Sequence, residues 1–372
     1  MIVGRWTVAV FAVFCAVASS ARKTVVWEGE KTIDRVVKIL AKDILVKPGA
    51  TVRFVGDGRI DLREGTLAAT NAAFLAEGVI TNAWRVSVVN GGLRLEGCRM
   101  RGLNAVDPVK DQKWYIGSVR VQGATVRIVG CNVEDSSGIA IVNTKDAEVA
   151  HNVFVGCDPG LFAFQTKAGR FANNEFVECR SEAMRVNAAQ ETEFANNRFT
   201  DCGRGIVNFA ARRCQFVGNS FFGGSSGIVS WWSVTGNLYS ANLFEDVKGA
   251  AFSALQPLGS DNVFANNVVC RCGYGWSLAK QKPNMRIVIR DNAILETATG
   301  ISIVEGVVDA PNNAIWNVKT PISVKDEAKV SAPGLVAADP LFKDSARGDY
   351  RLKPGSPLLN VGSSGCSIGL YQ

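Results

Sequence analysis

Hydrophobic and polar residues alternate in short stretches along most of the chain, and Gly or Asn separates the stretches. The same order returns as HNVF at 151–154, NNEF at 173–176, NNRF at 196–199 and GNSF at 218–221. Alternating stretches of this length fit β-strands and are too short for helices. The pattern therefore predicts a chain of many short strands joined by turns.

An Asn column sets the period of the repeat. The column contains Asn152, Asn174, Asn197, Asn219, Asn242, Asn267, Asn292 and Asn313, and the steps between them are 22, 23, 22, 23, 25, 25 and 21 residues. Two earlier units, at 97–100 and 130–133, have Cys in place of Asn. Aromatic residues recur three residues before the Asn and two residues after it. A unit of this size cannot bury its own apolar side, but units stacked in parallel about 4.8 Å apart can.

These columns resemble those of the right-handed parallel β-helix repeat proteins, the group with the pectate-lyase-like fold. The resemblance covers about residues 90–330. It implies an all-β fold, a right-handed parallel β-helix of about ten to twelve coils with caps at both ends. A leucine-rich repeat has a similar period, but its Leu/Asn consensus is absent from this chain.

The first residues have the order of a secretory signal peptide. Arg5 precedes an apolar run over 6–18, and small residues follow at 18–21. We therefore assign residues 1–21 to a signal peptide and expect a secreted protein, extracellular or periplasmic. No later segment has 18 uninterrupted apolar residues, so no membrane span is expected.

The mature chain divides into three parts. Residues 22–90 are expected to form an N-terminal cap and opening coils, and residues 91–330 the β-helix repeats. Residues 331–372 contain DPLF and GDYRL and are expected to be a C-terminal capping segment. A cap is expected because an open end would expose unpaired strand edges.

Composition limits the chemistry. The chain has 41 Lys and Arg residues against 34 Asp and Glu residues and carries a net charge of +7, without dense basic runs. This balance disfavours a nucleic-acid partner and suits an acidic polysaccharide. The single His, His151, excludes a His-rich metal centre. No cofactor is expected, with calcium as an open alternative, and we expect a monomer.

Nine cysteines remain after removal of the signal peptide, and most of them follow the repeat. Cys157, Cys179 and Cys202 all stand five residues after the Asn. We expect them to form an inward column of largely free thiols, because parallel stacked side chains rarely reach the dihedral angle of about 90° that a disulfide needs.

Outward residues near one strand column form a candidate site. We take Phe162, Phe164, Val207, Phe209, Val229 and Trp231 to face inward and the residues between them to face outward. The expected outward patch combines cations, amides and an aromatic ring, which suits an anionic sugar chain. Its members are Lys145, Lys167, Arg185, Asn187, Asn208, Arg212 and Trp232. A solvated face that keeps the solenoid soluble is the alternative.

A second column is acidic and stands four residues after the Asn. It contains Asp135, Glu178, Asp201, Asp246 and Glu296. Stacked carboxylates would favour a general acid or a bound cation, whereas turn residues that face water are the structural alternative. His151 lies in a turn column away from the patch, and we interpret it as structural.

Lys167 and Arg185 resemble the Lys-then-Arg arrangement of the chondroitinase-B and alginate-lyase family. The resemblance rests on KAGRFANNEF followed by AMRV, and it implies Lys167 as the base and Arg185 as the residue that assists at the uronate carboxylate. When the repeats are aligned by their columns, Arg185 occupies the position that Ala163 has on the preceding coil. Lys167 lies four residues after Ala163 on that coil. The acidic residues that a hydrolase of the polygalacturonase type or a calcium-dependent pectate lyase would need are absent from the corresponding positions of this sequence. An alginate epimerase would need Asp-Pro-His-Glu, whereas this chain has Cys-Asp-Pro-Gly at 157–160.

Two function classes stay open. The first is an exported enzyme on an acidic polysaccharide, a lyase that works by β-elimination. Its catalytic residues would be Lys167 and Arg185, and Lys145, Asn187, Asn208, Arg212 and Trp232 would bind substrate. The second is a non-catalytic secreted or surface solenoid that binds carbohydrate or has a structural role. A lyase needs its base and its carboxylate-binding cation at one substrate position.

Overall fold

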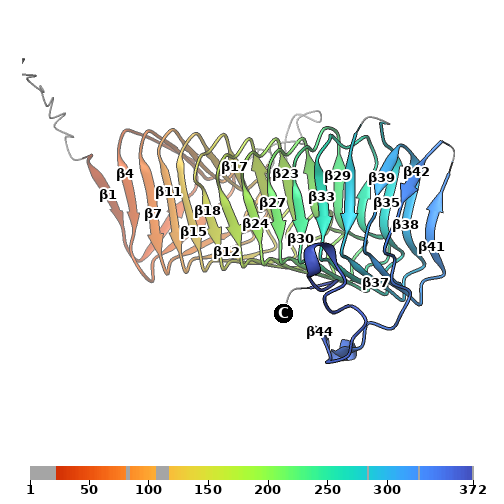
Figure 1. Ribbon diagram of the computed structural model, residues 1–372. Coiled ribbons are helices and arrows are strands. Elements are labelled where there is room, and N and C mark those ends of the chain that lie inside the picture. Colours follow the sequence, from red (N-terminus) through yellow and green to blue (C-terminus); the bar gives the residue numbers. More distant parts are fainter. Residues whose placement is uncertain (1–21, 81–83, 106–116, 283–284, 326, 371–372) are drawn as a thin grey trace, which may run out of the picture.

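The computed structural model is a right-handed parallel β-helix, and it describes residues 22–80, 84–105, 117–282, 285–325 and 327–370. Each coil contributes one strand to each of three parallel sheets, which run the length of the solenoid (Figure 1). The sheets have 14, 13 and 13 strands and are called sheets A, B and C. The all-β solenoid expected from the repeat is therefore confirmed.

Sheet A contains β1 (Thr24–Trp27), β4 (Asp43–Val46), β7 (Thr66–Thr70), β11 (Gly92–Glu96), β15 (Thr125–Val129), β18 (Glu148–Ala150), β21 (Arg170–Ala172), β24 (Glu193–Ala195), β27 (Gln215–Val217), β30 (Leu238–Ser240), β33 (Asn262–Ala265), β36 (Ile287–Arg290), β39 (Val307–Asp309) and β42 (Lys329–Ser331). Sheet B contains β2 (Glu30–Ile33), β5 (Thr51–Phe54), β8 (Ala73–Ala76), β12 (Arg99–Arg101), β16 (Asn132–Glu134), β19 (Val153–Val155), β22 (Glu175–Val177), β25 (Arg198–Thr200), β28 (Ser220–Phe222), β31 (Leu243–Glu245), β34 (Val268–Cys270), β37 (Ala293–Leu295) and β40 (Ala314–Trp316). Sheet C contains β3 (Val36–Leu40), β6 (Arg59–Arg63), β10 (Val86–Val89), β14 (Val119–Gln122), β17 (Ile139–Val142), β20 (Leu161–Phe164), β23 (Met184–Asn187), β26 (Arg204–Phe209), β29 (Ser226–Trp231), β32 (Ala250–Ala254), β35 (Tyr274–Lys280), β38 (Thr299–Glu305) and β41 (Thr320–Val324). Two short strands, β9 (Val79–Ile80) and β13 (Asn104–Ala105), form a separate pair.

One apolar core runs through all coils, because each inward position stacks on the same position of the next coil. The two Phe columns become two stacks of rings. In the first stack, Phe154, Phe176 and Phe199 lie nearly parallel, with centroids 4.8 and 5.0 Å apart. The second stack includes Phe171 and Phe194, whose centroids are 5.1 Å apart. The spacing matches the distance between parallel strands, so the register alone produces the stacks.

The Asn column forms a buried ladder at the turn between sheets A and B. The Oδ1 atom of Asn197 accepts hydrogen bonds from the backbone N–H and the side-chain amide of Asn174, at 3.0 and 2.9 Å. Its own Nδ2 donates to the backbone oxygen of Phe171 at 2.9 Å and to Asn219 at 3.0 Å. The backbone N–H of Cys131 donates to Asn152 in the same way, which confirms that Cys replaces Asn in the earlier coils. The ladder thus satisfies turn groups that no strand pairing reaches.

The C-terminal segment folds back along the solenoid. It contains β43 (Phe342–Asp344), the 3-10 turn η2 (Ser345–Arg347), β44 (Asp349–Leu352) and a second 3-10 turn, η3 (Ser363–Gly365). Its apolar residues pack with residues of β31, β34, β37 and β40, on the side of sheet B that faces away from the core. The contacts therefore place it on a flank of the last coils (Figure 1). The opening segment 22–90 already contributes strands to all three sheets.

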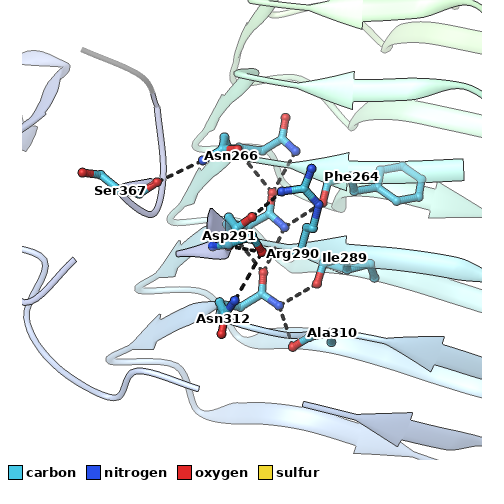
Figure 2. A network of polar contacts seen from close by, with 12 residues as sticks. Phe264, Asn266, Ile289, Arg290, Asp291, Ala310, Asn312 and Ser367 are labelled. Carbon is cyan, nitrogen blue, oxygen red and sulfur yellow. Dashed lines mark hydrogen bonds and ion pairs between the residues drawn. The ribbon is translucent and has the colours of Figure 1, made fainter. Parts of the chain in front are cut away.

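A polar network fastens this segment to the solenoid (Figure 2). The buried carboxylate of Asp291 accepts hydrogen bonds from the backbone N–H and the hydroxyl of Ser363, at 2.7 and 3.0 Å, and pairs with Arg290. The Nδ2 atom of Asn266 donates to the backbone oxygen of Ser367 at 3.1 Å. Figure 2 shows Asn266, Asp291 and Asn312 on consecutive turns of the coil stack, beside the returning chain. The segment is thus anchored by hydrogen bonds as well as by apolar contacts.

The expected signal peptide, residues 1–21, lies outside the described residues. In the part of the chain that is described, we find no helix with the length and apolar character needed to cross a membrane.

The cysteine column has the expected inward position. Cys157, Cys179 and Cys202 are almost completely buried, and the nine cysteines of the described residues are all free thiols. Burial raises the pKa of the Cys157 thiol to about 11. At neutral pH this thiol is therefore protonated and protected from reagents.

The ladder yields a stability prediction. Asn197→Ala removes an acceptor and a donor and leaves buried backbone groups without partners, so the free energy of unfolding should fall by about 1–3 kcal/mol. Asn132→Ala, at an exposed outward position of β16, is the matched control and should change stability by no more than about 0.5 kcal/mol. Urea unfolding of both variants measures the difference. Equal losses would contradict a structural role for the ladder.

Thiol counting tests the cysteine column. In denaturant, the mature protein should show nine free thiols. In the native state Cys366 should react first, because it is only partly buried whereas the other eight are buried. Fewer than three reactive thiols after denaturation without reductant would show that the column is oxidised.

Candidate functional site

The strand register determines which side chains of sheet C face outward. Met184 pairs with Leu161 and Ile206, and these three side chains belong to the core. Arg185 therefore faces outward, paired with Phe162 on one side and Val207 on the other. The next outward column follows from the same register and contains Phe164, Asn187, Phe209 and Trp231.

The prediction of which residues face inward in β20, β26 and β29 was wrong: the inward and outward positions are shifted by one residue. Phe162 and Phe164 share outward columns with Arg185 and Asn187, and the smaller Ala163 faces the core. Apolar character alone suggested the opposite phase. In a strand, a shift of one residue moves every side chain to the other face.

Asn208 is not part of the outward patch. Its side chain is fully buried and donates a hydrogen bond from Nδ2 to the Tyr239 hydroxyl at 2.9 Å. It stacks in register between Val186 and Ser230, and Ser230 is likewise buried. The predicted substrate contact of Asn208 is therefore corrected to an interior hydrogen bond.

An aromatic cluster lies on the outer face of sheet C at β26 and β29. Phe209 and Trp231 stack with centroids 5.8 Å apart and an interplanar angle of 10°. Trp232 lies 5.8 Å from Trp231 and 6.2 Å from Phe209. Trp232 is 52% exposed, so one edge of the cluster is open to solvent. Val207 and Val229, which also face outward, are buried with Phe209 in this cluster, which is separate from the main core.

Arg185 lies at the border of the cluster and is held by a buried carboxylate. Its Nε and a terminal nitrogen donate to the two oxygens of Glu182, at 2.6 and 2.8 Å. Arg204 donates to the same carboxylate at 3.3 Å. The guanidinium carbon of Arg185 lies 5.9 Å from the Phe209 ring centroid. The site therefore contains one carboxylate and two guanidinium groups, a residual positive charge that sequence analysis missed because it did not single out Glu182 or Arg204.

The remaining predicted cations occupy one column beyond the strands of sheet C. Isolated bridges connect Lys145 to Lys167, Lys167 to Gln190, and Gln190 to Arg212. Lys167 lies 3.8 Å from a Glu191 oxygen. The hydrogen bond from Arg213 and the charge of Lys167 lower the pKa of the Glu191 carboxyl. The predicted column of cations is thus present, but Lys167 is engaged in an ion pair.

Lys167 and Arg185 do not share a position on the face. The register aligns Arg185 with Phe162, so Lys167 lies five positions further along its coil. Between them the backbone turns at Gln165, with a φ of +51°. A predicted role of both residues at one reacting sugar would require substrate to span this turn.

Arg212 and Trp232 lie together in a groove at the turn between sheets C and A. The groove has a volume of about 450 Å³, and Pro257, Leu258 and Gly259 are among the residues that line it. The three residues belong to the segment between β32 and β33, in a coil with a 25-residue step. The longer spacing between the ladder residues Asn242 and Asn267 is the feature of the sequence that could have located the groove.

The acidic column lies in a tight turn after sheet B. Its five members all have positive φ values, between +46° and +57°. Arg271 occupies the same turn position on its coil and pairs with Asp246 at 2.8 Å. In the described residues, no three His, Cys, Asp or Glu side chains are arranged to hold a metal ion. The geometry supports the interpretation as turn residues. His151, with a φ of +57°, likewise occupies a turn.

Comparisons with known proteins agree on the architecture. The family described as the right-handed β-helix region matches residues 111–244. The crystal structure of the periplasmic alginate epimerase AlgG aligns with a TM-score of 0.53 and 13% identity, over 83% of this chain and 85% of that chain. Tailspike protein 3 of bacteriophage CBA120 aligns with a TM-score of 0.50 and 10% identity, over 86% of this chain and 55% of that chain. A search of curated proteins found no match. At these identities the likeness is one of fold: the chain has the right-handed parallel β-helix fold.

The Glu182 contact determines the expected effect of replacing Arg185. The side chains of Arg185 and Glu182 are 22% and 5% exposed. Arg185→Ala should therefore lower the free energy of unfolding by about 1–3 kcal/mol, because a buried carboxylate loses its main partner while Arg204 remains. Arg198→Ala, an exposed Arg of sheet B, is the control. Chemical unfolding should show the larger loss for Arg185→Ala, and equal stability of the two variants would contradict the buried pair.

Proposed function

We propose that this protein is exported and recognises an acidic polysaccharide on the outer face of sheet C. The observation that carries the proposal is the aromatic cluster of Phe209, Trp231 and Trp232, which ends at the cationic groove beside Arg212. Rings supply flat apolar surfaces for the C–H faces of sugars, and guanidinium groups pair with carboxylates or sulfates.

The position of the cluster supports a binding role. Outward positions of a solenoid sheet are normally polar, whereas this apolar cluster is buried at Phe209, partly exposed at Trp231 and exposed at Trp232. Clustered apolar groups that reach the solvent mark interaction surfaces. Trp232 is half exposed at the end of the cluster, where a ligand can reach it. The groove beside Trp232 combines apolar residues such as Pro257 and Met285 with polar and charged side chains, a mixture that suits an anionic sugar.

Charge supports an acidic partner. Removal of Arg5 with the signal peptide leaves 40 basic and 34 acidic residues, a net charge of +6. Arg185 and Arg204 together outnumber the single carboxylate between them. The alginate epimerase with a similar fold acts on an acidic polysaccharide according to its name, which is consistent with the proposal.

Cleavage by β-elimination is the catalytic form of the proposal. It retains Lys167 as the base and Arg185 as the cation at the uronate carboxylate. The separation of the two residues along the coil favours recognition over this particular catalytic pair. The same screen tests both forms, because a lyase releases unsaturated chain ends that absorb ultraviolet light.

The proposal is tested with the secreted protein and a panel of alginate, pectins, sulfated glycans and neutral glucans. Binding to at least one anionic glycan is expected, and it should weaken as salt rises, because exposed charges are screened over about 8–10 Å at physiological ionic strength. Trp232→Ala should weaken binding. Trp316→Ala, a 40% exposed Trp of sheet B, is the matched control and should not.

Absorbance from unsaturated ends that disappears in Lys167→Ala, with binding retained, would establish the lyase form. No binding to any anionic glycan, or equal losses in the two Trp variants, would contradict the proposed recognition face.

A further inference from the structure

The groove beside Trp232 carries two cations that sequence analysis did not bring together. Arg212 comes from the turn after β26, and Lys282 comes from the turn after β35, three coils further along the solenoid. Both line the groove together with Trp232 and the hydroxyl-bearing residues Thr235 and Ser260. No acidic residue is among the described residues that line it.

The two cations differ from neighbouring cations in the ion pairs that the described residues form. Lys145 lies 3.9 Å from Asp146, and Arg213 lies 2.6 Å from Glu191. Among the described residues, neither Arg212 nor Lys282 forms an ion pair within 4.0 Å. Two uncompensated positive charges at one groove attract an anion and gain more from it than paired cations do.

The groove is built before any ligand arrives. The side chain of Gln281, which is 2% exposed, accepts a hydrogen bond from the backbone N–H of Leu258 at 2.9 Å. The buried Asn262 donates to the backbone oxygen of Gly259 at 2.8 Å. These two amides hold the loop between β32 and β33 from both sides. A binding surface fixed in this way loses little conformational entropy when it binds.

Gly259 is required for the shape of the groove. A Cβ atom at this position would lie 1.8 Å from the Thr235 hydroxyl oxygen. The loop backbone can therefore approach the preceding coil closely only because no side chain is present. This close approach gives the groove a wall of backbone and hydroxyl groups beside the cations.

We infer that this groove is an anion subsite for one carboxylate or sulfate group of a glycan. Arg212 and Lys282 bind the anionic group, and the sugar ring that bears it packs on Trp232. The inference rests on the proposed function and assigns the negative charge of the polysaccharide to one place. Arg185 then contributes less to binding of this anionic group, because its guanidinium group already donates two hydrogen bonds to Glu182.

The test uses the intact secreted protein and three oligosaccharide probes of equal length. One probe carries only carboxylates, one carries only sulfates, and one is neutral. Affinities are measured by calorimetry for Arg212→Gln, Lys282→Gln and Arg213→Gln. Arg213 is the control, because it adjoins Arg212 in sequence but is paired with Glu191 and does not line the groove.

We expect Arg212→Gln and Lys282→Gln each to weaken an anionic probe about tenfold, the usual size of a lost charge-assisted contact. The salt dependence of the affinity should become shallower in both variants. Arg213→Gln should leave the affinity within about twofold of the original protein. The probe with the larger loss identifies carboxylate or sulfate as the bound group.

The two proposals fail in different ways. If the original protein binds an anionic probe and all three variants bind it equally well, the subsite inference is overturned while recognition elsewhere on the face stands. If the original protein binds no anionic probe, both proposals are overturned. A tenfold loss for the neutral probe in Arg212→Gln would also overturn the subsite, because it would show a damaged groove instead of a lost charge contact.

Discussion

The fold depends on the stacking of equivalent residues from coil to coil. A coil of about 22 residues has no core of its own, so every inward side chain must be covered by its counterpart above and below. The Asn ladder is the polar part of this constraint. Asn174 and Asn197 are buried at a turn, and each amide serves both as donor and acceptor along the axis. Because each bond joins neighbouring coils, the turns are fixed in the same register as the strands.

This constraint explains which parts of the structure could be predicted from the sequence. A column that must repeat in space also repeats along the chain, so the Asn ladder, both Phe stacks and the Cys column were visible as periodic residues. The turn positions of His151 and the acidic column followed from the same phase. The C-terminal segment has no repeat, and its place on the flank of sheet B depends on contacts such as Ser363 with Asp291, which no periodicity reports.

The candidate site could be predicted only in part, because outward residues are free of the stacking constraint. Hydrophobic alternation failed at β20, β26 and β29, where large apolar residues face outward and pack on one another. In those coils the inward positions hold smaller or polar residues, and Asn208 is accepted in the core because Tyr239 receives its hydrogen bond. At these strands the apolar pattern therefore does not tell which side chains face the core, because the polar Asn208 and Ser230 are buried there.

Charge on the face follows a similar logic. The sequence shows which residues are cations, whereas the register determines which of them already have a carboxylate partner. Lys167 and Arg185 are paired with Glu191 and Glu182, so their charges are already partly compensated within the protein. Arg212, from a coil with a 22-residue step, and Lys282, from a coil with a 25-residue step, line one groove with the turn between β32 and β33, where the repeat also expands to 25 residues. In a solenoid, extra residues at a turn cost the core nothing, because the three strands of each coil keep their register. Places where the period lengthens are therefore the positions at which such a scaffold can acquire a binding groove without disturbing the ladder that holds it together.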